Sequence, residues 1–307
     1  MPERQLHFNV LVMDSGYHES AWRVLEADPR AVLGLGHYAA IARIAERGLL
    51  DSLFFADYPG LAEFRVEFMP QPHFDPIDLV SALAPLTTHI GLIATGSTTY
   101  SAPWDLARRF ASLDFLSKGR AGWNVVTTAT AVAAANFGTA AHPDPAARYA
   151  RADEYVDVVQ RVWDGWEDEA LVASRESGVW ADRSRLHPPG FHGEHFDVAG
   201  ILPFPRSPQG HPILAQAGSS PAGIALAAKY ADVVFTAQPN VDEGVSFRRE
   251  LRAQVSASGR SPDALHVRPA SRSSWDRRRP RRRNAGTSSK GWRAPSSGGA
   301  TSCTCRG

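Results

Sequence analysis

Short apolar runs alternate with helical patterns along most of the chain. Seven runs of apolar residues predict strands, over 6–13, 52–57, 90–98, 120–128, 212–218, 232–237 and 265–269. Between these runs, apolar residues at i, i+3 and i+4 spacing predict helices, over 37–48, 76–85, 104–117, 148–166, 221–230 and 243–256. Continuous apolar strands that alternate with helices are typical of a parallel sheet covered on both faces. The pattern therefore predicts the α/β fold class.

The length of the repeats favours a (β/α)8 TIM-type barrel over an open sheet. Seven strand repeats fill 1–269, and no GxGxxG motif follows the first strand. Residues 167–211 are rich in Gly, Pro and His, and we interpret them as an insertion in the barrel. After Pro269 the chain contains no Leu, Ile, Val or Phe. The predicted barrel therefore lacks its last strand and its closing helices.

Charge divides the chain at the same position. The net charge of +1 combines a body of −8 over 1–269 with a segment of +9 over 270–307, where nine Arg and Lys290 face Asp276 alone. A segment so poor in apolar residues cannot bury enough surface to offset the entropy lost on ordering it. We therefore expect 1–269 to form one domain and 270–307 to be a basic, disordered tail.

Several classes of protein are excluded by what the sequence lacks. No apolar run approaches the ~18 residues of a membrane-spanning helix, and the N-terminus has no secretory signal pattern, so a cytoplasmic protein is expected. The HExxH and CxxC motifs of metal sites do not occur in the sequence. Ser-His-Asp and Cys-His arrangements are not evident either. No metal is expected, and no catalytic side chain is assigned.

Polar residues collect where the predicted strands end, and in a barrel the functional groups lie at those carboxyl ends. Asp57 ends the second strand, Thr95 lies in the third, and Asn124 and Thr127 lie in the fourth. Ser219 and Ser220 follow the fifth strand and directly precede a helix. Hydroxyl groups at a helix N-terminus favour an anion such as a phosphate. Ordinary capping of the helix by either serine is an alternative that the sequence leaves open.

A resemblance extends this interpretation over 1–269. It is carried by the segments FFADYPG (54–60), 95–128, NFG (136–138), 148–171 and 192–223. Together they resemble the flavin-dependent monooxygenases of the bacterial-luciferase-like family. The most similar branch contains nitrilotriacetate monooxygenase component A and the dibenzothiophene-sulfone monooxygenases. Members of this branch continue well beyond the position of Pro269, so we expect this chain to be C-terminally truncated or frameshifted.

The resemblance implies that reduced FMN binds at the C-terminal mouth of the barrel. The residues that it implies as cofactor contacts are Asp57, Thr95, Asn124, Thr127, His142, Tyr149, Ser219 and Ser220. Asp57 and Thr95 would lie near the flavin ring, while Tyr149 and the two serines would hold the phosphate. Arg148 would either add charge at the phosphate or lie on a solvated face, and Trp123 is interpreted as a packing residue.

The activity implied by the resemblance is that of an FMNH2-dependent monooxygenase, an oxidoreductase that uses O2 to oxygenate a small organic substrate. A separate NAD(P)H:flavin reductase would supply the reduced FMN, and a homodimer is compatible with the family. A deazaflavin cofactor, as in a related barrel family, is left open.

The alternative is a catalytically impaired remnant of the flavin fold whose basic tail binds polyanions or nucleic acid. Its basis is the run RRRPRRR (277–283), which could neutralise phosphates. Nucleic acid is not favoured, because only Trp275 and Trp292 are interleaved with the basic residues.

Overall fold

The computed structural model describes residues 7–24, 28–71, 74–138 and 141–270. Residues Met1–Ala270 form one compact unit. The expected basic tail lies outside the described residues except for Ala270, so its predicted disorder and its predicted binding to polyanions both stay predictions.

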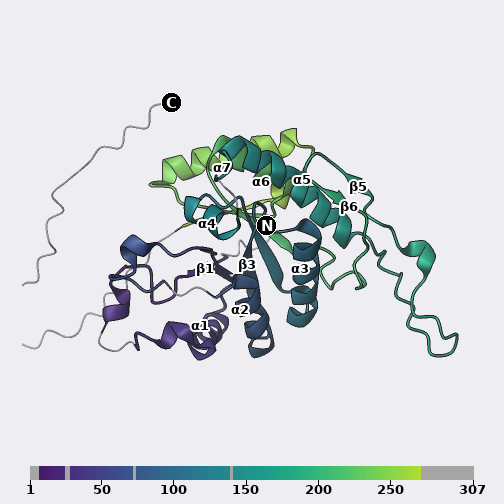
Figure 1. The fold of residues 1–307 in the computed structure, drawn as a ribbon, viewed down its shortest axis with the longest axis horizontal. Helices are drawn as coiled ribbons and strands as arrows, with labels where there is room; N and C mark the ends of the chain where they lie inside the picture. Colours follow the sequence, from purple (N-terminus) through teal and green to yellow (C-terminus); the bar gives the residue numbers. More distant parts are fainter. Residues whose placement is uncertain (1–6, 25–27, 72–73, 139–140, 271–307) are drawn as a thin grey trace, which may run out of the picture. The chain divides into compact units, whose positions relative to one another are not determined.

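A parallel sheet runs through the centre of this unit (Figure 1). Its seven described strands are β1 (Asn9–Val12), β2 (Ser52–Phe55), β3 (Gly91–Ser97), β4 (Ala121–Val126), β7 (Ile213–Ala217), β8 (Val233–Thr236) and β9 (His266–Pro269). They are hydrogen-bonded in the order β1-β2-β3-β4-β7-β8-β9, and every neighbouring pair is parallel. The predicted α/β class and all seven predicted strands are confirmed.

The sheet curls into a TIM-type barrel. Phe54 of β2 and Phe235 of β8 face each other across its interior, with ring centroids 6.1 Å apart. His7, just before β1, lies 6.4 Å from His266 of β9, measured between ring centroids. In a flat sheet these two strands would be separated by roughly 29 Å, at about 4.8 Å per strand spacing. Among the described residues no strand joins β1 to β9, so the ladder of backbone hydrogen bonds is not closed there.

The described residues form seven α-helices. They are α1 (Leu35–Arg47), α2 (Pro76–Leu83), α3 (Pro103–Ser117), α4 (Ala131–Asn136), α5 (Pro145–Trp163), α6 (Pro221–Tyr230) and α7 (Val241–Ala257). Most of them cover the outside of the sheet (Figure 1), whereas α4 lies against the loop that follows β2. Proline occupies the first turn of α2, α3, α5 and α6, where its missing N–H leaves no helical bond unmade. Side chains of Asp75, Asp144, Ser220 and Asn240 cap four N-termini.

Two helical features differ from the sequence expectations. Helix α5 begins at Pro145 rather than residue 148, because Asp144 accepts the N–H of Ala147 and caps the helix earlier. Helix α4 lies in a stretch that showed no helical periodicity. It consists mostly of alanine, whose strong helix propensity does not depend on an apolar stripe.

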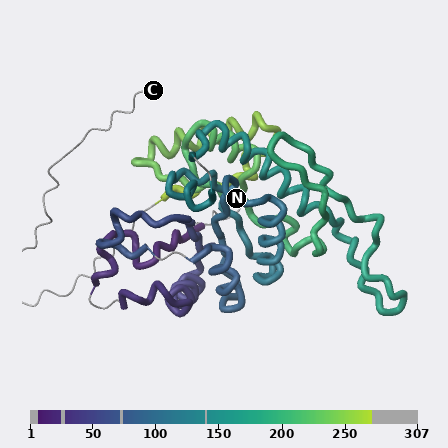
Figure 2. The backbone as a smooth tube through the Cα atoms, viewed as in Figure 1, coloured from purple at the N-terminus to yellow at the C-terminus, as the bar shows by residue number. Residues whose placement is uncertain are grey.

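The interpreted insertion contains little regular structure. Strands β5 (Phe191–His192) and β6 (Asp197–Val198) form a short antiparallel pair. Before them, Leu171 bridges Ala181 in an antiparallel loop that extends away from the barrel, seen in teal-green in Figure 2. The exposed Trp180 lies on this loop. No helix in the described part of the chain is long and apolar enough to cross a membrane.

Trp123 holds the helical layer against the sheet. Its side chain is fully buried, and its ring lies 5.9 Å from Phe110 of α3 and 6.3 Å from Trp163 of α5. The indole N–H donates to the carbonyl of Gly96 at 3.0 Å. A Cβ on Gly96 would lie 2.7 Å from Leu106 and 2.9 Å from the indole nitrogen, so only glycine fits. The expected packing role of Trp123 is confirmed.

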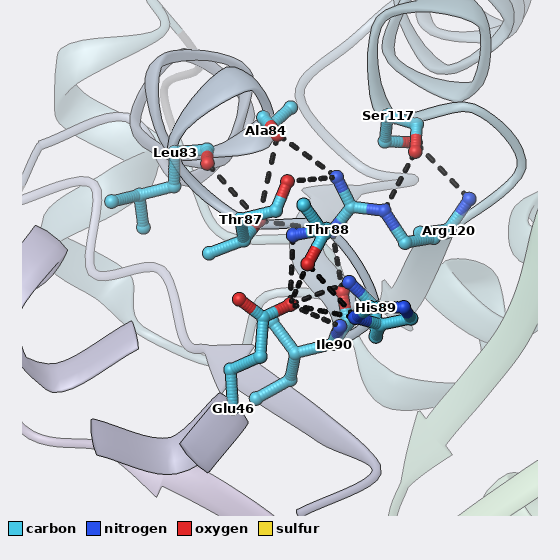
Figure 3. Close-up of polar contacts among 9 residues, drawn as sticks. All are labelled: Glu46, Leu83, Ala84, Thr87, Thr88, His89, Ile90, Ser117 and Arg120. Atoms are coloured by element: carbon cyan, nitrogen blue, oxygen red, sulfur yellow. Dashed lines mark hydrogen bonds and ion pairs between the residues drawn. The ribbon is translucent and has the colours of Figure 1, made fainter. Parts of the chain in front are cut away.

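A polar network ties the amino-terminal end of the barrel together (Figure 3). Glu46 of α1 accepts the backbone N–H groups of Thr88, His89 and Ile90, just before β3. Arg120, just before β4, donates to the carbonyls of Ala84, Thr87 and Ile90. Because this end of a barrel serves stability rather than chemistry, we assign the network a structural role.

Replacing Glu46 by Gln is expected to destabilise the protein by about 1 kcal/mol at pH 7, because the charge-assisted hydrogen bonds are lost. Burial raises the pKa of Glu46, but the bonds from His89, Thr88 and Ile90 together outweigh it and lower the pKa below 4.5. A lowered folded-state pKa contributes stability above the unfolded-state pKa, and that stability is lost as pH falls through the folded-state value. In urea unfolding, the difference in the free energy of unfolding between wild type and Glu46→Gln should therefore shrink below about pH 4.5. The exposed Glu250→Gln is the control, and a difference independent of pH would contradict the prediction.

Candidate functional site

The carboxyl ends of neighbouring strands bring the predicted site residues to one end of the barrel. Thr95 of β3 is in register with Asn124 of β4, and Asn124 is in register with Ala215 of β7. Asp57 lies two residues beyond the end of β2 and is half-buried. Thr127 directly follows β4. The site is therefore built on the mouth of the barrel, as the strand pattern predicted.

Asn124 and Thr95 form a buried relay inside this mouth. The Asn124 Nδ2 donates to Thr95 Oγ1 at 2.8 Å, and Thr95 Oγ1 donates to the carbonyl of Phe55 at 2.8 Å. Asn124 is only 3% exposed, and its Oδ1 has no hydrogen-bond partner among the described residues. An unsatisfied buried acceptor is unfavourable by about 1–3 kcal/mol. Asn124 thus offers an acceptor to a ligand that carries an N–H group.

A polar cradle lies at the N-terminus of α6. Ser220 Oγ accepts the N–H of Gly223 at 3.1 Å, and it shares a 3.3 Å hydrogen bond with the Tyr149 hydroxyl. A Cβ on Gly223 would come within 3.1 Å of both hydroxyl oxygens and 3.5 Å of Gln216 Nε2. Gln216 is buried, and its Oε1 has no partner in the described part of the chain. Ser220 is therefore the helix cap that the sequence left open, and its hydroxyl lies with that of Tyr149 at a helix N-terminus, a place that suits an anion.

A third group surrounds His142. Its Nδ1 shares a 2.8 Å hydrogen bond with the Tyr100 hydroxyl, and the Tyr100 ring stacks on Phe137 with centroids 4.8 Å apart. His142 Nε2 is buried and has no partner within the described ranges. Sequence reasoning named His142 but not the two aromatic residues. Tyr100 lies just after the predicted third strand, and Phe137 is the central residue of the NFG segment (136–138).

The structure contradicts one of the two sequence interpretations of Arg148, that of a residue on a solvated face. Arg148 is only 8% exposed, so it does not lie on a solvated face. Its guanidinium donates to the carbonyls of Pro143, Thr127 and Thr128, and to Thr127 Oγ1. Because α5 starts three residues earlier than expected, Arg148 falls within the helix and points to the end of β4. Thr127 therefore contacts Arg148, a partner that the sequence did not suggest.

The electrostatics of the mouth favour an anionic ligand. One turn along α5, Arg151 donates to the carbonyl of Thr98 and lies over the Phe196 ring at 4.3 Å. Burial lowers the pKa of the Arg151 guanidinium, but arginine stays protonated at neutral pH. Two guanidinium groups thus bond mainly to neutral carbonyl oxygens close to the strand ends, which leaves their positive charge available to an anion nearby.

The structure groups the predicted residues into three sets. Thr95 bonds directly to Asn124, Tyr149 to Ser220, and His142 to Tyr100. Ser219 is exposed beside the cradle. Beside Asp57, its chain neighbours Ala56 and Tyr58 line a small hollow together with Asp14, Tyr38 and Phe74.

Comparison with known proteins identifies the family of this chain. Residues 17–285 match the family model described as luciferase-like monooxygenase, so the chain belongs to that family. It is 42% identical over 277 residues to nitrilotriacetate monooxygenase component A of Aminobacter aminovorans, covering 87% of this chain and 61% of that protein. The chain spans about three fifths of the length of the curated relatives it matches.

Two solved structures show the same fold over 87% of this chain. The crystal structure of a long-chain alkane monooxygenase has a TM-score of 0.83 and 33% sequence identity, with 64% of that chain covered. The structure of a riboflavin lyase with modified FMN and riboflavin has a TM-score of 0.81 and 34% identity, with 62% covered. The expected luciferase-like barrel is confirmed.

Proposed function

We propose that this protein is the oxygenating component of an FMNH2-dependent, two-component monooxygenase that acts on a small organic substrate. One observation carries the proposal. A buried acceptor without a partner, Asn124 Oδ1, lies in the same barrel mouth as the polar cradle of Ser220, Tyr149 and Gly223. An N–H group of a flavin ring can donate a hydrogen bond to Asn124 Oδ1. The phosphate of FMN can accept hydrogen bonds from the polar cradle. Membership of the luciferase-like monooxygenase family supports this pairing.

Reduced FMN, when bound, supplies the two electrons with which O2 gives one oxygen atom to the substrate and the other to water. In the proposed site, Asn124 orients the ring through Oδ1, with Thr95 fixing the Asn124 amide. Tyr149, Ser219 and Ser220 hold the phosphate at the start of α6. Asp57 and Thr127 lie at strand ends on the ring side. His142 and Tyr100 form a polar wall.

The proposal includes a partner. Electrons would arrive through a separate NAD(P)H:flavin reductase, the partner that the family resemblance implies. The matched relative from Aminobacter is named as a component A, which supports a system of more than one protein. A cytoplasmic location and a homodimer belong to the same proposal.

Anaerobic titration with reduced FMN tests the cofactor, with reduced deazaflavin as the comparison. Saturable binding of FMNH2 that is tighter than binding of the deazaflavin is expected. A coupled assay with a flavin reductase, NADH, FMN and O2 then tests oxygenation, using a panel that includes nitrilotriacetate and long-chain alkanes. Tighter binding of the deazaflavin, or no binding of either cofactor, would reject the proposal.

Asn124→Leu separates binding from stability. The variant keeps the number of side-chain heavy atoms and removes an unsatisfied buried acceptor, but it also loses the hydrogen bond to Thr95, so the free energy of unfolding should fall by no more than about 2 kcal/mol. Flavin affinity should fall about tenfold, the equivalent of one hydrogen bond. Urea unfolding and flavin fluorescence measure the two quantities. Unchanged flavin affinity would remove Asn124 from the site.

A further inference from the structure

The backbone is strained at the exit of β4. Thr128 has a φ of 31°, in the left-handed region. A β-branched residue rarely adopts this conformation, because its Cβ then approaches the neighbouring carbonyl oxygen. Thr128 is half-buried and lies next to Thr127, in the mouth of the barrel. Such strain persists only where the surrounding structure compensates for it.

The compensating contacts come from two directions. Arg148 Nη1 donates to the Thr128 carbonyl at 3.2 Å and to the Thr127 carbonyl at 2.9 Å. From the other side, Thr128 Oγ1 donates to Ser97 Oγ at 2.7 Å, at the end of β3. Arg148 Nε also donates to the carbonyl of Pro143 at 3.1 Å, in the segment that leads into α5. One buried guanidinium therefore joins the β4 exit to the start of α5.

These contacts link the two halves of the proposed site. Tyr149 follows Arg148 directly and reaches the cradle at Ser220. Thr127 follows β4, the strand that carries Asn124. No carboxylate forms an ion pair with Arg148 within the described part of the chain. The hydrogen bonds of the Arg148 guanidinium go to neutral carbonyl and hydroxyl oxygens. The Arg148 side chain thus connects the start of α5, which carries Tyr149, to the exit of β4, which carries Thr127.

We propose that Arg148 is a positioning residue that stabilises the left-handed conformation of Thr128 and thereby fixes the flavin-binding mouth of the barrel. This inference rests on the proposed function for its flavin readout. The hydrogen bonds by which Arg148 holds the loop at Thr127 and Thr128 do not require a cofactor.

The test combines Arg148→Met with a change of strain at Thr128. Arg148→Met should weaken the binding of both FMN and riboflavin about tenfold, because both contain the ring that the mouth orients. Thr128→Gly in the same chain should restore most of that affinity, since glycine adopts the left-handed conformation without penalty. Thr128→Ala removes the same hydroxyl but retains the strain, so it should not restore binding. Arg148→Lys, which lacks the guanidinium fork, should give an intermediate loss and covers the case in which Arg148→Met fails to fold.

Amide hydrogen exchange in the absence of flavin gives an independent readout. Exchange at residues 127–130 should accelerate at least about tenfold in Arg148→Met and return toward wild type with Thr128→Gly. Arg161→Met is the matched control, because Arg161 lies on the exposed side of α5 and pairs with Asp157. It should change neither measurement.

Two results would overturn the inference. If Arg148→Met weakens FMN binding and leaves riboflavin binding unchanged, then Arg148 acts on the phosphate as a charge. If Thr128→Ala restores affinity as well as Thr128→Gly does, the backbone conformation is not what Arg148 stabilises. Failure of the wild type to bind either flavin would reject the proposed function, whereas the exchange experiment would still decide the role of Arg148.

Discussion

Replacing Trp123 by Ala is expected to lower the free energy of unfolding by about 3–5 kcal/mol, the usual range for truncating a fully buried large aromatic residue. The indole fills the space between β4 and the helices α3 and α5, and its N–H satisfies the carbonyl of Gly96. Trp123→Ala removes the ring contacts with α3 and α5, and it leaves the Gly96 carbonyl without the indole donor. Urea unfolding followed by circular dichroism measures the change.

Trp180→Ala is the matched control for this prediction. Trp180 lies on the protruding loop of the insertion and is 69% exposed, so the same truncation should change stability by less than about 1 kcal/mol. Equal losses in the two variants would show that the helical layer does not depend on the buried indole.

Gly223→Ala should weaken FMN binding about 100-fold while leaving riboflavin binding within about threefold of wild type. The added methyl group would lie 3.1 Å from the hydroxyl oxygens of Ser220 and Tyr149, so it would displace the two hydroxyl groups that are proposed to hold the phosphate. Loss of two charge-assisted hydrogen bonds of about 1.5 kcal/mol each corresponds to that factor. The free energy of unfolding should change by less than about 1 kcal/mol, because the higher helix propensity of alanine offsets the small shift that the two hydroxyl groups must make. Fluorescence titration with the two flavins measures the difference.

The control is another glycine in a helix. At Gly244 of α7 a Cβ would meet only Gln238, at 3.9 Å, so Gly244→Ala should leave the affinity for both flavins unchanged. If Gly223→Ala weakens FMN and riboflavin equally, or weakens neither, the phosphate is not held at the start of α6.

The strand and helix pattern of the barrel was predictable because each element there has a strong local signal. Strands buried on both faces appear as continuous apolar runs, and proline with a capping side chain marks the start of α2 and α6. Helix α4 was missed because it is short and almost uniformly small, so it has no periodic stripe. Strand ends give an expected location for polar side chains, which is why Asn124 and Thr95 were found as neighbours.

The partners of those side chains were not predictable. Whether Arg148 bonds to an anion or to carbonyl oxygens depends on where α5 meets β4, a contact between residues about 20 positions apart. Likewise, Tyr100 meets His142 across 42 residues of sequence. The left-handed Thr128 has no signal in composition, since threonine normally favours a strand. Such features arise only when separate segments pack together.

The sequence by itself therefore determined the α/β barrel, the order of its strands and the end of the barrel at which polar residues collect, because these follow from local hydrophobic periodicity. Only the tertiary structure decided which polar atoms are satisfied by the protein and which remain open to a ligand. Asn124 Oδ1 is left without a partner among the described residues, whereas the guanidinium of Arg148 is engaged by carbonyls. Hydrogen bonds are short and directional, so this distinction depends on distances that only the packing of strands against helices sets.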